Sequence, residues 1–352
     1  MLKPPRRCAD DCGPPCRPTA DRQNRRHFAR QLLSQAACTA GFCTAGLLGV
    51  ASLFSSSGCV PSAQVGRTPD LVWGRRGFSE GRLLKPRAMT ISDQNELFIV
   101  DMMGRIQVFD IDGNYLRGWR TPIITQGKPT GLGFSHDGSL LVADTHYFRM
   151  LVYSLAGQLD ESRTIGGEHG DQPGQFHFVT DVAQGPNGHF FIGQYGQIDR
   201  IQEFDPAGQF VRSWGSQGSA PEQFSRPQAL AFDAQGLLWI ADACNHRIQV
   251  FDVAGSIPRL ERIWGQPGRG AGQLNCPYGL AFDRQGNLLL AEFGNHRVQR
   301  FSPEGQSLEI WGGVGDEPGL FQRPWAVGTD SLGNVHVLDT ENHRVQRFPR
   351  AA

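Results

Sequence analysis

Histidine, arginine and carboxylate side chains stand close together around the motif Asn-His-Arg-[Val/Ile]-Gln, which occurs at residues 245–249, 295–299 and 342–346. Imidazole and carboxylate groups at such spacing could exchange protons or ligate a metal ion. A catalytic site, however, needs different groups in different roles, whereas a motif written three times creates equivalent positions. The motif is therefore predicted to serve the architecture rather than the chemistry.

An acidic residue precedes the motif arginine by four or five positions in most copies. These acids are Asp101, Asp144, Asp242, Glu292 and Asp339. Each would end one strand just before the arginine opens the next, so that carboxylate and guanidinium could pair across the hairpin. We predict that these pairs hold each repeated unit together.

The elements that position these residues repeat along the chain. The arginine recurs six times, at Arg105, Arg149, Arg200, Arg247, Arg297 and Arg344. Short runs rich in Val, Ile, Leu and Phe accompany it, as at residues 227–233, 237–242 and 246–252, and a fourth run ends most units near Trp-Gly. Units of roughly 40 to 50 residues with four antiparallel strands are typical of propeller blades. The sequence predicts an all-β, six-bladed β-propeller.

The unit P-x-G-L-A-F-D-x-x-G-N-L-x-x-A-D-x-x-N-H-R-V-Q-x-F resembles the NHL repeat across residues 69–349. The resemblance implies one fold and several functions, among them RNA binding, protein interaction, extracellular sensing and the lyase step of peptide amidation. In that lyase, histidines after the blade-opening prolines bind zinc. No histidine occupies those positions here, and Ala243 stands where the lyase has a tyrosine before the turn cysteine. We therefore expect no metal or other cofactor, and a lyase or hydrolase acting in the central channel is the alternative function.

The first and last units together indicate how the ring closes. A Leu-Val-Trp-Gly run at residues 71–74 precedes the first complete unit, whereas no fourth strand follows Phe348. Resemblance to other propellers implies that residues 70–74 supply the missing outer strand and so cover a sheet edge. Residues 69–349 are expected to form the propeller, after a linker at residues 60–68.

One rim of this propeller is predicted to gather the side chains that differ most between repeats. It combines the residue after each blade-opening proline with the turn after each second strand, because neighbouring strands run in opposite directions. The candidates are Arg87, Thr130, His146, Tyr147, Tyr195, Gln228, Tyr278, Phe293 and Trp325. Aromatic and arginine side chains dominate binding hot spots, so the rim is predicted to bind a protein, peptide or glycan. The alternative is that these side chains pack against one another.

The third repeat departs most from the pattern. Val179 replaces its proline, Gln194 replaces the strand-ending acid, and Asp181 stands where the other repeats carry Ala or Gly. Asp181 is thus a candidate site residue, or else the repair of an irregular blade. Cys244 and Cys276 lie near the same rim in neighbouring repeats and could form a disulfide in an oxidising compartment.

The first 59 residues have a different composition, typical of an export signal. Residues 1–30 carry eight Lys or Arg and three Asp, and residues 31–66 carry no charge. Arg25 and Arg26 resemble the twin-arginine motif, with general secretion as the alternative. Ser-Ser-Gly-Cys at residues 56–59 resembles a lipobox, which makes Cys59 a candidate for lipidation; an uncleaved membrane helix is the alternative. Either anchor would place the propeller on the periplasmic side of the cell envelope.

Charge narrows the range of partners. The chain has 34 basic and 34 acidic groups, so removing residues 1–59, with eight and three, leaves 26 against 31. A propeller with a net charge of about −5 lacks the basic footprint of a nucleic-acid-binding surface. The C-x3-C-x3-C spacing of Cys8, Cys12 and Cys16 also differs from the paired C-x2-C of zinc ribbons. We expect a monomeric, membrane-tethered module that binds an envelope protein, peptide or glycan.

Overall fold

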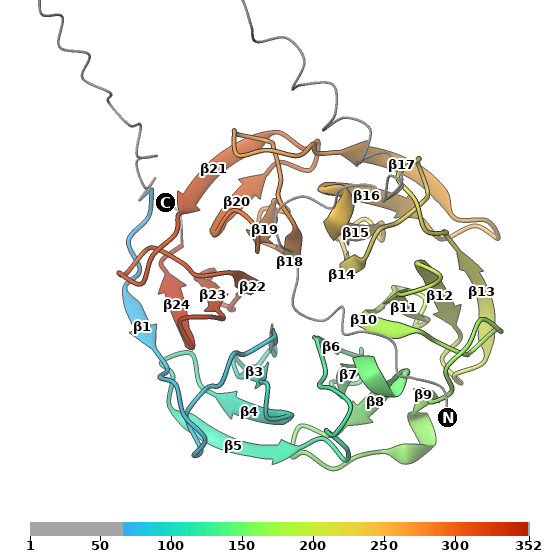
Figure 1. Cartoon of the computed structure of the whole chain (residues 1–352), viewed down its shortest axis with the longest axis horizontal. Coiled ribbons are helices and arrows are strands. Elements are labelled where there is room, and N and C mark those ends of the chain that lie inside the picture. Colours follow the sequence, from blue (N-terminus) through green and yellow to red (C-terminus); the bar gives the residue numbers. More distant parts are fainter. Residues whose placement is uncertain (1–65, 351–352) are drawn as a thin grey trace, which may run out of the picture. The chain divides into compact units, whose positions relative to one another are not determined.

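Six four-stranded antiparallel sheets surround a common axis in the computed structural model, which describes residues 66–350 (Figure 1). The predicted six-bladed all-β propeller is confirmed. The export-motif residues Arg25 and Arg26 and the lipidation candidate Cys59 lie outside the described residues. Within residues 66–350, no helix has both the length and the apolar character needed to cross a membrane.

Each blade runs from an inner strand at the axis to an outer strand at the periphery. Blades one to three comprise β2 (Ala88–Ile91), β3 (Leu97–Val100), β4 (Arg105–Phe109), β5 (Tyr115–Arg120); β6 (Gly131–Phe134), β7 (Leu140–Asp144), β8 (Arg149–Tyr153), β9 (Ile165–Gly166); and β10 (Phe178–Gln184), β11 (Phe190–Tyr195), β12 (Arg200–Phe204), β13 (Phe210–Trp214). Blades four to six comprise β14 (Pro227–Phe232), β15 (Leu238–Asp242), β16 (Arg247–Asp252), β17 (Arg259–Trp264); β18 (Pro277–Phe282), β19 (Leu288–Glu292), β20 (Arg297–Phe301), β21 (Ser307–Gly312); and β22 (Pro324–Thr329), β23 (Val335–Asp339), β24 (Arg344–Phe348), β1 (Leu71–Trp73). In the described part of the chain, three single-turn 3-10 helices lie in loops, at Thr145–Tyr147, Glu161–Arg163 and Ala243–Asn245.

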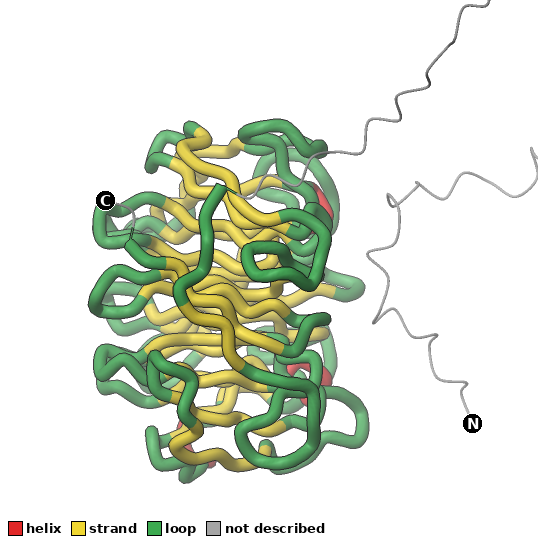
Figure 2. The backbone as a smooth tube through the Cα atoms, turned by 90° about the vertical axis from the view of Figure 1, so that its left-hand side faces the viewer, coloured by secondary structure: helices red, strands yellow, loops and turns green. Residues whose placement is uncertain are grey.

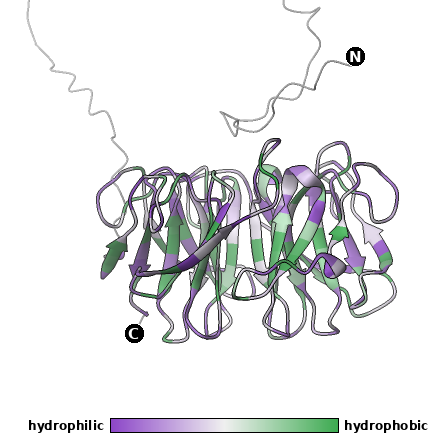
Figure 3. Ribbon diagram, turned by 90° about the horizontal axis from the view of Figure 1, so that it is seen from below, coloured by the Kyte–Doolittle hydropathy of each residue, from purple (hydrophilic) through white to green (hydrophobic). Residues whose placement is uncertain are grey.

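The strands follow from burial on one or both faces. The second strands β3, β7, β15, β19 and β23 are buried at every position, because neighbouring blades pack on both of their faces. The outer strand β5 instead alternates half-buried and exposed residues, since one of its faces meets water. Hydrophobic clusters therefore lie between blades, and the hydrophobic colour in Figure 3 is concentrated in the strands.

Buried ion pairs join the second and third strands and also hold the loops between blades. Arg247 Nε lies 2.7 Å from Asp242 Oδ2, and its two terminal nitrogens donate to the carbonyls of Ser219, Ala220 and Gln223 at 2.6 to 2.8 Å. The same pairing occurs at Arg105, Arg149, Arg297 and Arg344, at 2.6 to 3.0 Å. The predicted carboxylate–arginine pairs are confirmed. The loops that they anchor lie at one end of the strands; Figure 2 shows loops at both ends. We call this end, where the inner strands begin, the mouth face.

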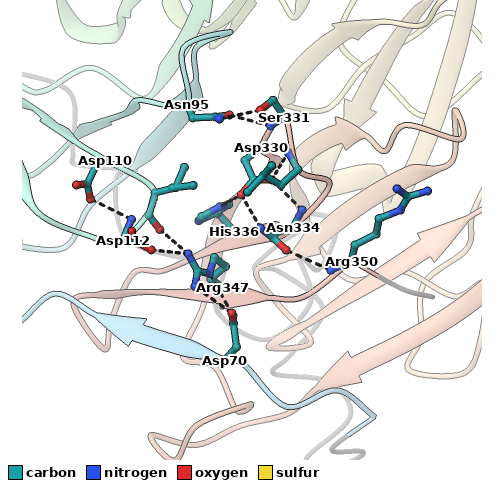
Figure 4. Close-up of polar contacts among 12 residues, drawn as sticks. Asp70, Asn95, Asp110, Asp112, Asp330, Ser331, Asn334, His336, Arg347 and Arg350 are labelled. Atoms are coloured by element: carbon teal, nitrogen blue, oxygen red, sulfur yellow. Dashed lines mark hydrogen bonds and ion pairs between the residues drawn. The ribbon is translucent and has the colours of Figure 1, made fainter.

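The ring closes between β1 and β24, as predicted. The two strands pair antiparallel, with Leu71 opposite Arg347 and Trp73 opposite Val345. Arg347 also bridges Asp70 at 3.0 Å and Asp112 of blade one at 2.8 Å (Figure 4). Strand pairing and charge thus join the last blade to the first.

Trp73→Ala is expected to lower the free energy of unfolding by about 2 kcal/mol, because the Trp73 ring packs 4.8 Å from the Phe109 ring at this junction. Val72→Ala is the matched control, since Val72 points to the other face of β1 and is 37% exposed. Urea unfolding of both variants measures the difference. Equal effects of the two substitutions would contradict this role of Trp73.

Candidate functional site

The six inner strands line a cavity of about 390 Å³ on the propeller axis. Its walls are mostly Ala, Gly, Leu, Thr and Gln, and among the lining residues Asp181 is the one carboxylate and Arg87 the one cation. Five sequence-predicted residues lie at the mouth of this cavity: Arg87, Thr130, Gln228, Tyr278 and Trp325. A channel of this size is in the range of small-ligand sites.

Asp181 lies on β10 of blade three, and its side chain is close to residues of blades two and four. Its Oδ2 accepts a hydrogen bond from the Leu230 N–H of blade four at 3.0 Å. A Cβ atom on Gly131 of blade two would lie 2.4 Å from Asp181 Oδ1, so the glycine leaves the room that the carboxyl occupies. Burial raises the pKa of Asp181 to about 7. The residue is nevertheless only half-buried, because it lines the cavity. The group can therefore gain or lose a proton near neutral pH, as a general acid or base must.

Aromatic and cationic side chains form a continuous series of contacts around the mouth, which we call the mouth ring. Successive members are 4.7 to 5.5 Å apart, in the order His146, Phe178, Tyr195, Arg226, Tyr278, Trp325 and Arg87. The charge of Arg87, at one end of the series, helps to lower the pKa of His146 at the other end. Each of the six blades contributes at least one member.

Tyr278 and Trp325 support the guanidinium groups rather than offering their ring faces to a ligand. Tyr278 is 4% exposed and Trp325 is 9% exposed. Phe293 stacks on Tyr278 with ring centroids 4.6 Å apart, and meets Trp325 edge-on at 5.6 Å. Arg226 lies over Tyr195 and Tyr278, in the cation–π arrangement that favours a fixed guanidinium plane. Rim packing therefore describes Tyr278 and Trp325, which the sequence could not distinguish from exposed anchors.

The sequence interpretation identified Arg87 but missed four other cations at the mouth. Lys85, Lys128, Arg226 and Arg323 each stand directly before a blade-opening proline, so Lys/Arg-Pro, four times in six repeats, was the available signal. Lys85 pairs with Glu341 at 2.9 Å, and Lys128 Nζ donates to the Ile124 carbonyl at 2.9 Å. The backbone φ angles of Lys85, Arg226 and Arg323 lie in the left-handed region, at 44°, 61° and 53°. This is a costly conformation for residues with a side chain, and the surrounding structure must hold it.

The motif histidines supply that support. Each accepts a hydrogen bond at Nδ1 from the backbone N–H that precedes the proline of the next blade: His343 from Lys85, His246 from Cys276 and His296 from Arg323, at 2.8 to 3.2 Å. Blade three has no such histidine, and Asp199 takes its place by accepting from the Arg226 N–H at 2.6 Å. The predicted structural role of the motif therefore extends to positioning the mouth.

His146 sits where three of these charges converge. Burial lowers its pKa, and the cations Arg87, Lys128 and Arg226 lower it further. A Cβ atom on Gly127 would lie 2.0 Å from the imidazole ring, so this glycine makes the position of the ring possible. His146 is consequently neutral at pH 7, inside a positive potential.

The remaining candidates have other roles. Thr130 Oγ1 lies 2.8 Å from Thr145 Oγ1 and donates to the Thr180 carbonyl, which ties blade two to blade three. Gln228 accepts from Arg226 Nε at 2.8 Å. Tyr147 lies outside the mouth ring, where its hydroxyl accepts from the Gln126 N–H at 2.9 Å.

The described residues form neither the disulfide considered from the sequence nor a cluster suited to a metal ion. Cys244 and Cys276 are not joined by a disulfide. His169 and His177 are neighbours, with ring centroids 4.5 Å apart, but His177 pairs with the exposed Asp171 at 2.7 Å. Across residues 66–350, no three His, Cys, Asp or Glu side chains are grouped so as to hold a metal. The zinc of an amidating lyase does not fit these residues.

Family models define the class of protein. The model described as "SMP-30/Gluconolactonase/LRE-like region" matches residues 88–312, and the NHL repeat model matches residues 321–348. The first match covers more than half of the chain, which therefore belongs to the SMP-30/gluconolactonase/LRE-like family. Its last blade also matches the NHL repeat.

Individual relatives differ widely in kind. The chain is 28% identical to human NHL repeat-containing protein 3 over 160 residues, which is 43% of this chain and 46% of that protein. It is 35% identical to peptidyl-glycine alpha-amidating monooxygenase B of Xenopus laevis over 192 residues, 52% of this chain and 20% of that protein. The chain thus spans less than half the length of these relatives.

Solved structures show the fold alone. A streptogramin B lyase superposes with a TM-score of 0.56 at 15% identity, covering 78% of this chain and 95% of the lyase. The WD40 propeller domain of Doa1 does so with a TM-score of 0.55 at 13% identity, covering 81% and 98%. A lyase and a WD40 domain fit almost equally well, so these likenesses do not select a function.

Asp181→Asn is expected to raise the free energy of unfolding by about 1 kcal/mol or more at pH 8, and to change it little at pH 4. The folded-state pKa of about 7 lies above the value for an unfolded Asp, so the folded protein binds the extra proton. The contribution of Asp181 to the stability of the wild type therefore falls as pH rises from about 4 to about 7, and is flat above that. Urea unfolding across this range measures the effect.

Asp137→Asn is the control, because hydrogen bonding from the Ser135 hydroxyl lowers the pKa of Asp137 and gives the opposite sign. A parallel pH response of Asp181→Asn and the wild type would contradict the raised pKa.

Proposed function

We propose that the protein is a binding module of the cell envelope, exported and tethered by its N-terminal segment, that captures part of a protein, peptide or glycan at its channel mouth. The mouth ring carries this proposal. Arg87 of blade one and Arg226 of blade four both belong to it, and Arg87 also lines the cavity of about 390 Å³. Arginine held on aromatic rings is a typical binding hot spot.

The net charge supports a local rather than an extended anionic ligand. Residues 60–352 carry 26 basic and 31 acidic groups, so a long polyanion such as a nucleic acid is repelled at a distance. The cations at the mouth act only over about one Debye length, roughly 8 Å at physiological ionic strength. A partner that presents a single anionic group to the mouth is consistent with both the negative net charge and the short range of the cations.

A lyase or hydrolase acting in the channel is the second candidate. It is favoured by Asp181, whose pKa of about 7 suits a general acid or base. It also draws on the 35% identity to a peptidyl-glycine alpha-amidating monooxygenase. The cavity lining offers Asp181 no second carboxylate or histidine with which to divide acid and base roles.

Arg226→Ala is expected to reduce capture of envelope proteins by the purified propeller at least tenfold, which corresponds to about 1.4 kcal/mol. Arg284→Ala is the matched control, because Arg284 is exposed in the turn after β18, at the end opposite to the mouth. Quantitative pull-down with melting temperatures for both variants measures the effect. Unchanged capture by Arg226→Ala, with wild-type turnover of a peptidyl-hydroxyglycine that Asp181→Asn abolishes, would favour the enzyme.

Replacing Arg25 and Arg26 together by Lys is expected to stop export, because the twin-arginine receptor reads the guanidinium pair rather than charge alone. Cys59→Ala should abolish incorporation of labelled fatty acid. Cell fractionation and lipid labelling measure both effects. Continued export of the double Lys variant would indicate general secretion, and a wild type that never takes up label would indicate a membrane helix.

A further inference from the structure

We propose that a second site, on the face opposite to the mouth, binds a phosphate group in a pocket lined by four arginines between blades five and six. We call it the basic pocket, and its arginines are Arg67, Arg284, Arg300 and Arg350. This site is separate from the channel mouth and would bind its ligand whether or not the mouth captures a partner.

The basic pocket brings together four segments that are far apart in the sequence. Arg67 precedes β1 and Arg350 follows β24, the two strands that close the ring. Arg284 lies in the turn between β18 and β19, and Arg300 lies near the end of β20. Inner strands begin at the mouth face and the blades are antiparallel, so all four positions lie at the opposite end. The fold itself therefore gathers these charges.

The lining of the pocket is strongly positive. Of its nine residues four are arginines and one, Asp283, is a carboxylate, which leaves a net charge of +3. Glu309, which lies 3.6 Å from Arg67 Nε, reduces this to +2. Residues 60–352 as a whole carry 26 basic and 31 acidic groups, so the pocket is opposite in sign to the propeller. A concave site lined by one sign of charge concentrates ions of the other sign.

Two of the arginines are fixed by neighbouring groups and still have a nitrogen to offer. Arg300 Nε lies 2.7 Å from Asp283 Oδ2, and its Nη2 donates to Gln285 Oε1. Arg67 Nη2 donates to the Pro349 carbonyl. Neither arrangement uses Nη1, which bonds to nothing among residues 66–350 in either arginine. A fixed guanidinium with a free N–H edge loses little entropy when it binds an anion.

The other two arginines are free to move onto a ligand. The side chains of Arg284 and Arg350 are exposed and make no hydrogen bond or ion pair within the described part of the chain. The stem of Arg350 packs on the turn of blade six, since a Cβ atom on Gly333 would lie 3.1 Å from Arg350 Cδ. In Figure 4 its guanidinium points away from the pair Asp330 and His336. Both arginines can therefore contact an anion without breaking an existing interaction.

Size and charge together favour a phosphate group. The enclosed space is about 20 Å³, which has room for about one water-sized atom. A phosphate group could place one oxygen in this space and keep its ester bond outside. At pH 7 a phosphate monoester carries a charge of about −1.5 to −2, whereas a carboxylate carries one negative charge. Guanidinium groups match phosphate oxygens with paired N–H donors, so four arginines around one tetrahedral anion are well used.

Two sources of the phosphate group fit this pocket: a phospholipid headgroup and free phosphate. Cys59 precedes Arg67 by eight residues, which span at most about 28 Å when fully extended. A propeller tethered through Cys59 would therefore keep the pocket within about that distance of the membrane surface. The lipid source rests on the tether proposed above, whereas free phosphate does not.

Isothermal titration of the full-length chain with inorganic phosphate, at constant ionic strength, measures the site. Replacing Arg284 and Arg350 together by Gln is expected to weaken binding at least tenfold, because both direct contacts are lost. Arg75→Gln is the matched control, since Arg75 is an exposed arginine of the mouth face whose side chain has no partner among residues 66–350. It should bind phosphate as the wild type does. Acetate should bind the wild type at least tenfold more weakly than phosphate.

Thermal stability separates a binding site from a structural cluster. Like charges repel in the empty pocket, so the double Gln variant should melt at the wild-type temperature or above in buffer without phosphate. Phosphate should then raise the melting temperature of the wild type and of Arg75→Gln more than that of the double variant, since a ligand stabilises the folded state that binds it. A double variant that melts several degrees lower without phosphate would make these arginines structural and would overturn the inference.

Sedimentation with vesicles distinguishes the two sources. The full-length wild type and the double Gln variant are mixed with vesicles of phosphatidylcholine, with and without phosphatidylglycerol. A lipid headgroup as ligand predicts a preference for the phosphatidylglycerol vesicles that the double variant loses. Free phosphate as ligand predicts binding in the titration and no such preference. Both proteins carry the same N-terminal segment, so their difference reports the pocket.

Three results would overturn the inference. They are full retention of phosphate and vesicle binding by the double variant, equal affinity of the wild type for acetate and phosphate, and no binding of either probe by the wild type. None of them bears on capture at the mouth, which Arg226→Ala tests. Arg284→Ala provides the converse, because it should keep capture at the mouth and weaken phosphate binding.

Discussion

The rest of the structure depends on the hydrogen bonds and the ion pair of the arginine that begins the third strand of each blade. In blade four it joins a buried carboxylate on the neighbouring strand to three carbonyl groups of the loop that enters the blade. Removing one partner of such a buried pair leaves an uncompensated charge and costs about 3–5 kcal/mol. The loop that this arginine holds ends at the blade-opening proline. The arginine therefore also helps to position the residues at the mouth. In blade three, Arg200 keeps its three carbonyl partners although Gln194 replaces the acid. The contacts between the arginine and the loop therefore form without the ion pair.

The fold was predictable because repetition supplies the same evidence six times. The strands expected at residues 227–233, 237–242 and 246–252 are found at Pro227–Phe232, Leu238–Asp242 and Arg247–Asp252. Closure by residues 70–74 was also predictable, since a blade without its outer strand leaves an edge that the first strand can cover. These inferences needed only contacts within a repeat or between the first and last strands of the propeller.

The site was harder to predict, because its contacts run between blades. Tyr278 is buried by Phe293 of its own blade and by Trp325 of the next, a relation that no pattern within one repeat contains. The histidine of the motif likewise acts on the following blade, and only the structure shows that Asp199 replaces it in blade three. Asp181 was identified from its departure from the repeat, but its contacts with Gly131 and Leu230 depend on the curvature of the ring.

The pairing of β1 with β24 has a consequence for biosynthesis. Asp70 bonds Arg347, a residue made 277 positions later. At typical rates of about 5–20 residues per second, the ribosome needs roughly 15–55 s to synthesise the partner of the first strand. During that interval Trp73 has no sheet to join, and a chain cut short before β24 would keep both the edge of blade six and the strand meant for it exposed. Ring closure therefore reports that synthesis has passed β24, and chains cut short before β24 carry an exposed apolar strand by which chaperones and proteases can recognise them.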